Sequence, residues 1–415
     1  MLDRRMFLKK SAVAAAAAGH PVSASLERDG PPQLPLSSDP AALLPAVPFH
    51  GEHQAGITNP PPPAATFVAL DITAADRSGL EELLRTITTR ARLLTSGGRP
   101  PNLGSVAPPA DSGTLGPIIP ADALTVTLGV SGDLFDDRFG LSAQRPRQLG
   151  AMRSFPNDDL DPAWLGGDLL LQLCAGSEDT VLHALRDILK QTRGGMQVRW
   201  RLNGFIAPGR PHGVPRNHFA FHDGIANPAV ANRTVADRLL WLSAAAGEPR
   251  WAQGGSYWVV RLIRQYVEFW DRVSLREQET MIGRYRASGA PLGMRRAEDI
   301  PDYARDPRGH QIPTNAHIRL ANPRTEATAL SRILRRSYNY DAGMDEAGNL
   351  NFGLIFNCFQ QDLKRQFEAT QERLIGEPMV DYITPFGGGY FFALPGVRAS
   401  SGYLGQSLIE AAHSS

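Results

Sequence analysis

Apolar residues in the first half of the chain recur with two different periods. Residues 67–72 form a mostly apolar run that predicts a strand, whereas apolar residues between Leu80 and Leu94 return every three or four positions, as on one face of a helix. The full pattern predicts a strand over 67–72, a helix over 80–94, strands over 124–130 and 168–174, a helix over 181–189 and a strand over 198–202. This β-α-β-β-α-β order is the ferredoxin-like unit.

The second half of the chain repeats that order. Its pattern predicts a strand over 256–263, a helix over 267–282, strands over 333–340 and 351–358, a helix over 363–374 and a strand over 390–394. We therefore expect an α+β fold of two ferredoxin-like β-α-β-β-α-β halves with antiparallel sheets, over residues 49–215 and 216–412. The space between two such halves would suit a cofactor.

The N-terminus has the order of an export signal. Arg4 and Arg5 precede Met-Phe-Leu-Lys-Lys, a short apolar stretch covers residues 12–18, and Val22-Ser23-Ala24 offers the small residues of a cleavage site. The arginine pair resembles the signal that the Tat translocase recognises. We expect residues 1–24 to be a Tat signal peptide, residues 25–48 to be a Pro-rich linker or arm, and the mature protein to be periplasmic or extracellular.

Composition excludes some partners. The chain has 43 basic and 42 acidic residues, and no basic block lies beyond the extreme N-terminus, so nucleic acid is not an expected partner. No later segment reaches 18 apolar residues, which argues against stable membrane insertion. Cys174 and Cys358 lie in apolar, strand-like runs, and although export would permit a disulfide, we expect buried free thiols.

Three polar clusters could carry chemistry. His317 lies in a segment that also contains Arg319 and Arg324; imidazole is a common ligand of haem iron, and a guanidinium matches the carboxylate of a haem propionate. Asp223 follows aromatic residues and precedes a glycine, and Arg335 lies near the start of a predicted strand. Each cluster alone has an ordinary explanation, respectively a loop histidine, an Asp-Gly turn and a solvated strand end.

Together the clusters resemble the dye-decolourising (DyP-type) haem peroxidase family, most closely its Tat-exported, deferrochelatase-like branch. Residues 220–224 match a Gly-x-x-Asp-Gly motif with Ala220 in place of the first glycine, and residues 317–324 reproduce a His-x-Arg-x-x-Asn-Pro-Arg motif. Arg335 stands eighteen residues after His317, as the family's distal arginine does. Supporting stretches lie at 51–56, 254–261, 289–292 and 387–396, so the resemblance covers nearly the whole mature chain.

The resemblance implies one haem b per chain, bound in the C-terminal half. It implies that His317 binds the iron from the proximal side, that Asp223 acts as the acid/base toward peroxide, and that Arg335 stabilises the charge on the departing oxygen. A ferryl intermediate would then oxidise dyes, phenols or other bulky reductants. The expected haem contacts are Gly224, Ile225, Ala226, His317, Asn322, Pro323, Arg324 and Arg335.

The sequence leaves open the roles of His222 and Asp362. His222 is adjacent to Asp223, and because neighbouring residues of an extended segment point to opposite sides, we expect only one of them to face the haem. The second ring nitrogen of His317 should donate to a carboxylate, and Asp362 is a candidate. An acid that begins a helix is an equally good interpretation of Asp362.

Other functions would use the same pocket. A deferrochelatase would release iron from intact haem, and a haem or iron carrier in iron uptake would bind it without chemistry. The distal Asp223 and Arg335 argue against a carrier, which needs neither. The expected partners are hydrogen peroxide, small-molecule reductants and, during export, the Tat translocase; a homo-oligomer and iron-uptake components stay open.

Overall fold

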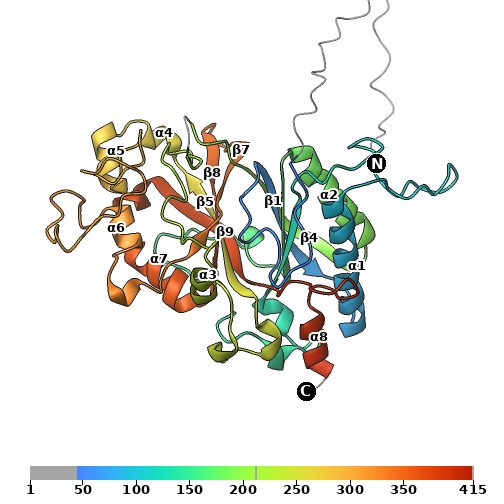
Figure 1. The fold of residues 1–415 in the computed structure, drawn as a ribbon. Helices are drawn as coiled ribbons and strands as arrows, with labels where there is room; N and C mark the ends of the chain where they lie inside the picture. Colours follow the sequence, from blue (N-terminus) through green and yellow to red (C-terminus); the bar gives the residue numbers. More distant parts are fainter. Residues whose placement is uncertain (1–43, 211–212, 414–415) are drawn as a thin grey trace, which may run out of the picture. The chain divides into compact units, whose positions relative to one another are not determined.

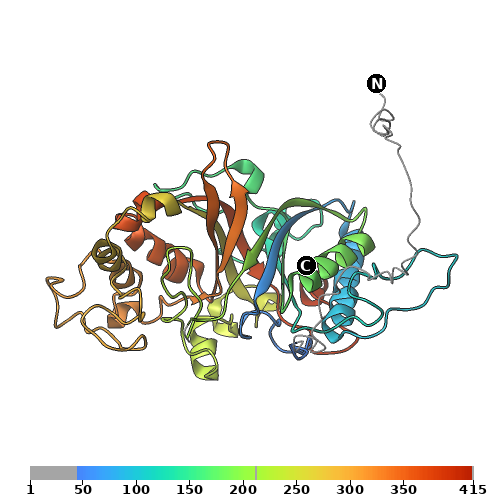
Figure 2. The same cartoon turned by 90° about the horizontal axis from the view of Figure 1, so that it is seen from above.

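A computed structural model describes residues 44–210 and 213–413 of the chain. The predicted signal peptide (1–24) and most of the predicted linker (25–48) lie outside these residues. In Figures 1 and 2, helices α1 and α2 lie on one outer side of the strands, and α6 and α7 lie on the opposite outer side.

The first half has the predicted elements in the predicted order. They are β1 (Ala64–Ile72), α1 (Arg77–Ser96), β2 (Thr125–Ser131), β3 (Leu169–Ala175), α2 (Glu178–Gln191) and β4 (Met196–Phe205). The side chain of Asp76 caps α1 by accepting a hydrogen bond from the Gly79 amide, and Gly97 ends the helix with a φ of 65°. The apolar residues expected on the inner face of α1 are buried.

The second half keeps the order but interrupts its elements. They are α3 (Arg233–Leu239), β5 (Ser256–Gln265), α4 (Val267–Trp270), α5 (Leu275–Ile282), α6 (His317–Ala321), β6 (Leu334–Arg335), β7 (Tyr338–Met344), β8 (Leu350–Gln360), a π-helix (Leu363–Glu368), α7 (Ala369–Leu374), β9 (Ile383–Ala393) and α8 (Gln406–His413). The single helix predicted over 267–282 is wrong, because Ser274 caps a new helix there by accepting from the Glu277 amide.

The strands of both halves pair in the same order. The first half runs β2-β3-β1-β4 and the second runs β9-β5-β8-β7, and every pair is antiparallel. The expected ferredoxin-like halves are therefore confirmed. The structure adds that their edges join, β2 to β9 and β4 to β7, so the two sheets close into one ring of strands.

The hydrophobic core of the described residues has two large clusters and a smaller one around Phe219 and Trp270. One large cluster lies inside the ring and brings together Phe67 of the first half with Trp258 and Phe391 of the second. The other large cluster packs the outer sheet faces under the helices. Cys174 and Cys358 are buried and free, as expected.

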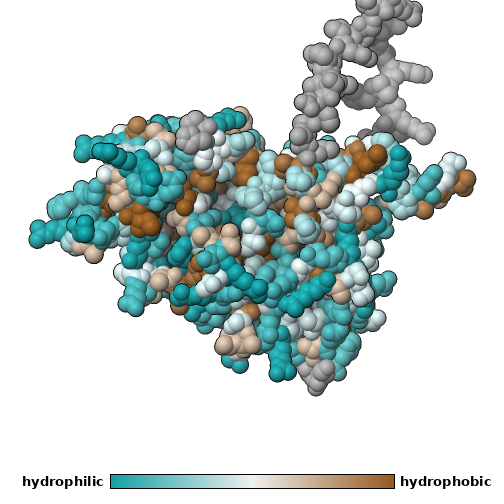
Figure 3. All heavy atoms as spheres, viewed as in Figure 1, coloured by the Kyte–Doolittle hydropathy of each residue, from teal (hydrophilic) through white to brown (hydrophobic). Residues whose placement is uncertain are grey.

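On the face drawn in Figure 3, hydrophilic side chains predominate and hydrophobic ones stand in separate patches. Across residues 44–210 and 213–413, no helix combines the length and the apolar character that crossing a membrane requires.

Candidate active site

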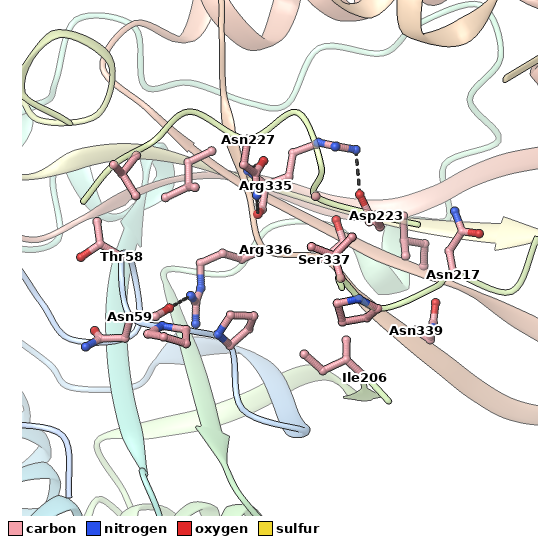
Figure 4. Close-up of a pocket in the computed structure, with 18 of the residues that line it drawn as sticks. Thr58, Asn59, Ile206, Asn217, Asp223, Asn227, Arg335, Arg336, Ser337 and Asn339 are labelled. Atoms are coloured by element: carbon pink, nitrogen blue, oxygen red, sulfur yellow. Dashed lines mark hydrogen bonds and ion pairs between the residues drawn. The ribbon is translucent and has the colours of Figure 1, made fainter. Parts of the chain in front are cut away.

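Asp223 and Arg335 form an ion pair beside a cavity that residues of both halves line. Asp223 lies on the loop between β4 and α3, Arg335 lies on β6, and Oδ1 of Asp223 is 2.8 Å from Nη1 of Arg335 (Figure 4). Their side chains are 17% and 27% exposed, respectively. Oδ1 of Asp223 is buried and, apart from this ion pair, accepts no hydrogen bond from the described residues. A carboxylate with so few partners can accept a proton from a small ligand.

The loop around Asp223 has an unusual backbone. Ala220 has a φ of 66°, in the left-handed region, at the position where the family motif has glycine, and Gly224 has a φ of 98°. The ring of His222 donates from Nδ1 to the Val214 carbonyl oxygen at 2.8 Å. His222 is therefore engaged with the backbone, and Asp223 is the residue of the two that contacts Arg335.

His317 begins α6, and its ring has one fixed hydrogen-bond partner. Nδ1–H donates to Oε2 of Glu377 at 2.6 Å, and the imidazole and carboxylate are 33% and 4% exposed. This bond fixes the tautomer that leaves Nε2 as the metal-binding nitrogen. Arg373 of α7 donates to the carbonyl oxygens of Leu320 and Ala321, which holds α6 in place.

The charges around His317 show which groups lie near it. Burial disfavours the imidazolium, but the charge and hydrogen bond of Glu377 outweigh burial and raise the pKa of His317. Smaller effects come from Arg335, which lowers this pKa, and from Asp223, which raises it. His317, Arg335 and Asp223, the residues expected to carry the chemistry, are thus close enough for their charges to interact.

The expectation that Asp362 is the partner of His317 is wrong. Oδ1 of Asp362 accepts a hydrogen bond from the Arg365 amide at 2.8 Å, so this acid caps the helix that follows it. The observed partner, Glu377, precedes Pro378 in a short connection before β9. Sequence spacing gave no signal for it, because the tertiary fold alone brings it to His317.

Arginines surround the same region with few acids. Burial lowers the pKa of the Arg284 guanidinium to about 10, and the positive charges of Arg324 and Arg335 act in the same direction. Nε of Arg324 is buried without a hydrogen bond, and Arg324 itself has a φ of 58°. Within the described ranges, Arg284, Arg324 and Arg332 form no ion pair with an acid. Such a group of cations suits a ligand that carries carboxylates.

Arg319, the other arginine of the His317 motif, is engaged elsewhere. Its guanidinium donates to the carbonyl oxygens of Ile312 and Asp306, and it lies 3.5 Å from the Asp306 carboxylate. It therefore anchors the loop before α6 and is not free to bind a carboxylate ligand.

The cavity beside Asp223 and Arg335 has a volume of about 440 Å³. That volume is more than ten times the roughly 30 Å³ that a water molecule occupies in the liquid, so peroxide would fill a small part of it. Ser337 also lines this cavity, and its Oγ is buried without a hydrogen bond. Sequence reasoning missed Ser337, although it lies two positions after Arg335 and hence on the same side of the strand.

The remaining predicted haem contacts lie around these groups with varied exposure. Gly224 lines the cavity, Ile225 is half-buried and Ala226 is exposed. Asn322 and Pro323 are half-buried in the turn after α6, where Asn322 accepts from the Arg324 amide.

These residues fit haem. An imidazole with a fixed tautomer and arginines without acid partners suit an iron porphyrin with two propionates, and the Asp223–Arg335 pair suits the small ligand of its iron. His317 would bind the iron, and Arg324 lies where it could pair with a propionate.

Known proteins resemble this chain along most of its length. Family models match at residues 54–206, for the N-terminal part of the Dyp-type peroxidase, and at residues 214–398, for its C-terminal part. A deferrochelatase from Yersinia pestis is 50% identical over 368 residues, which cover 88% of this chain and 85% of that protein. A deferrochelatase from Escherichia coli O157:H7 is 47% identical over 412 residues, which cover 98% and 97%.

Solved structures agree with these matches. A DyP-type peroxidase from Cellulomonas bogoriensis has a TM-score of 0.78 and 36% identity, covering 88% of this chain and 98% of that one. Ferric DtpA from Streptomyces lividans has a TM-score of 0.80 and 33% identity, covering 89% and 98%. With the site geometry, the family models and the near relatives in agreement, this chain belongs to the Dyp-type peroxidase family.

Proposed function

We propose that this protein is a haem-dependent peroxidase that uses hydrogen peroxide to oxidise dyes, phenols or other bulky reductants. The observation that carries the proposal is the Asp223–Arg335 ion pair, whose charges act on the imidazole of the His317–Glu377 pair. An acid/base and a fixed cation next to a metal-binding imidazole suit the cleavage of an O–O bond. The membership of the Dyp-type peroxidase family supports the same conclusion.

Each residue of the site has a separate role in the proposed reaction. Haem, when bound, supplies the redox-active iron. The Asp223 carboxylate accepts the proton of one peroxide oxygen and returns it to the other, since apart from the Arg335 ion pair its buried Oδ1 accepts no hydrogen bond from the described residues. The Arg335 guanidinium stabilises the negative charge on the departing oxygen. Glu377 orients the imidazole of His317 and increases its basicity.

A second candidate function is the release of iron from haem. It is favoured by the name deferrochelatase, which relatives at 47–50% identity carry. The same pocket would serve both reactions. A carrier without chemistry has less support, because it would need neither Asp223 nor Arg335.

One experiment separates these candidates. The absorption spectrum of the purified haem-loaded protein is recorded before and after hydrogen peroxide is added, with a phenol or dye present. A peroxidase changes the Soret band at once and oxidises the dye while the porphyrin keeps its iron. Metal-free protoporphyrin as the product, with no oxidised dye, would favour the deferrochelatase, and an unchanged spectrum would favour the carrier.

We further propose export by the Tat translocase to the periplasm or the outside of the cell. The support is the Arg4-Arg5 pair followed by an apolar stretch and small residues at 22–24. Replacing both arginines by lysine should leave the full-length precursor in the cytoplasm, as cell fractionation would show. A homo-oligomer and association with iron-uptake components are further proposals, which sizing chromatography and co-purification would test.

A further inference from the structure

We propose that Asn227 is a positioning residue, whose carboxamide fixes the backbone of Arg335 relative to Asp223. This inference rests on the proposed function, because it concerns the geometry of the pair that acts on peroxide. Nδ2 of Asn227 donates to the Arg335 carbonyl oxygen at 2.8 Å, and the Arg335 amide donates to Oδ1 of Asn227 at 3.0 Å. One side chain thus makes both hydrogen bonds that a neighbouring strand would make to one residue.

The strand that carries Arg335 needs such a partner. β6 has two residues and pairs only with β8, where Arg335 lies opposite Cys358. The next residue turns toward β8, since the Arg336 amide donates to the Asn357 carbonyl oxygen at 2.7 Å. Backbone groups alternate sides along a strand, so those of Arg335 point to the other edge. At that edge the described residues offer no further strand beside β6, and Asn227 takes its place.

Farther along the chain, at β7, the strand β4 covers the edge that Asn227 covers at Arg335. β4 meets β7 at the pair Phe205 and Asn339, four residues after Arg335. β6 and β7 pair with β8 in one continuous register, so the backbone groups of Arg335 and Asn339, four residues apart, point to the same edge. β4 does not extend to Arg335, so the carboxamide continues the pairing that β4 begins.

The other end of the link is the loop that carries Asp223. The Asn227 amide donates to the Gly224 carbonyl oxygen at 3.0 Å, which closes a turn directly after Asp223. Gly224, where this turn begins, has a φ of 98°, and Asn227 lies beside Arg335 in Figure 4. The acid and the cation come from elements 112 positions apart in sequence, and Asn227 joins the two elements directly.

The functional consequence concerns the peroxide step alone. Displacement of a reacting group by about 1 Å can cost on the order of 100-fold in rate. Without the carboxamide, the backbone of Arg335 can move away from the Asp223 loop while His317 and its Glu377 partner stay in place. We therefore expect slower reaction with peroxide, with haem binding and the later oxidation of reductant unaffected.

The test uses four variants of the haem-loaded protein. Asn227→Ala and Asn227→Leu both remove the two hydrogen bonds, and leucine keeps the side-chain volume. Asn232→Ala is the matched control, because Asn232 caps α3 five residues later through the Val235 amide and is exposed. Asp223→Asn is the benchmark for the proposed function. Stopped-flow absorbance gives the rate constant with peroxide, and steady-state kinetics give kcat/KM for the reductant.

A second readout needs no haem. The Arg335 amide is bonded to Asn227, so its hydrogen–deuterium exchange in the haem-free protein reports the link directly. We expect both Asn227 variants to exchange this amide about tenfold faster or more, and to react with peroxide about tenfold more slowly or more. The reductant kcat/KM and the haem content should stay at their wild-type values, and Asn232→Ala should change neither the exchange nor the peroxide rate.

The outcomes separate the positioning role of Asn227 from the proposed function. A wild-type peroxide rate in Asn227→Leu, while Asp223→Asn is slowed, overturns the positioning role and leaves the proposed function intact. Unchanged exchange of the Arg335 amide in both Asn227 variants also overturns the role. A wild-type peroxide rate in Asp223→Asn overturns the proposed function, and this inference with it.

Discussion

Two histidine–carboxylate pairs in this molecule have nearly the same geometry and different surroundings. In the first half, Nε2 of His183 lies 2.5 Å from Oδ2 of Asp111, and the side chains are 1% and 9% exposed. In the second half, Nδ1 of His317 lies 2.6 Å from Oε2 of Glu377, and the imidazole is 33% exposed. The pair itself therefore does not identify a site.

The surroundings decide what each pair can do. His183 lies on the buried face of α2, and its pair fastens the loop between α1 and β2, which Lys190 also holds by donating to the Pro109 carbonyl oxygen. The ring of His317 retains an open side, and the charges of Arg335 and Asp223 act on it. A buried pair between a helix and a loop stabilises that loop, whereas a pair with an exposed ring beside other charged side chains can hold a cofactor.

The largest effect should come from removing the two histidines in turn. His317→Ala should abolish the haem Soret band or shift it severely, because the iron loses its protein ligand. His183→Ala should keep the haem and lower the melting temperature, since it leaves the Asp111 carboxylate without its partner. Absorption spectra and thermal melts of both variants measure this. If His317→Ala still bound haem as the wild type does, His317 would not be the iron ligand. The two histidine–carboxylate pairs would then no longer differ in function.

Glu377 should have the next largest effect. Glu377→Gln keeps a side chain of the same size but removes the negative charge that supports His317, so the reaction with peroxide should slow by about 10- to 100-fold. Asp362→Ala is the matched control; it should cost about 1 kcal/mol of stability through the lost helix cap and leave the reaction unchanged. Stopped-flow rates and urea denaturation separate the two. The opposite result would return Asp362 to the role that the sequence suggested.

The sequence predicts the regular parts of the fold better than the contacts of the site. The first half follows from hydrophobic patterning, because its two long helices bury one face each and β1, β2 and β3 are buried along nearly their whole length. Glu377 is 60 residues from His317, and no periodicity or spacing connects them. Asn227 bonds to backbone atoms of Arg335, and a backbone partner leaves no trace in the sequence. Motifs therefore indicate which residues to examine, and the tertiary fold determines what supports them.

The Asp111 carboxylate makes the first-half pair sensitive to acid. Burial raises the pKa of Asp111, but hydrogen bonds from the Gly113 amide and from His183 outweigh burial, and the net pKa is below its ordinary value of 3.8. A depressed pKa means that the carboxylate stabilises the fold above about pH 3.8, and that this contribution is lost as pH falls through the folded pKa.

Asp111→Asn should therefore lower the free energy of unfolding by about 1–2 kcal/mol near pH 7, and the difference from wild type should shrink below about pH 4. Urea denaturation of both proteins at several pH values measures the difference. If the gap stayed constant down to about pH 3, the pair would stabilise the loop through packing and not through the charge of Asp111.

The smallest expected effect concerns Ala220, on the loop that carries Asp223. A left-handed conformation costs a residue with a side chain about 1–2 kcal/mol, and Ala220 has a φ of 66°. Ala220→Gly should remove that strain, although the greater flexibility of glycine in the unfolded chain returns about 0.4–1 kcal/mol of it. The expected net result is a stabilisation of about 0.5–1 kcal/mol, measured by urea denaturation.

The control for this substitution is Ala229→Gly, at an exposed position of the same loop that has no positive φ. It should destabilise the protein by up to about 1 kcal/mol, because glycine there relieves no strain and only adds flexibility to the unfolded chain. Equal effects of the two substitutions would mean that Ala220 carries no strain in the folded protein. Opposite effects would show that the loop beside Asp223 holds a strained backbone, as functional loops often do.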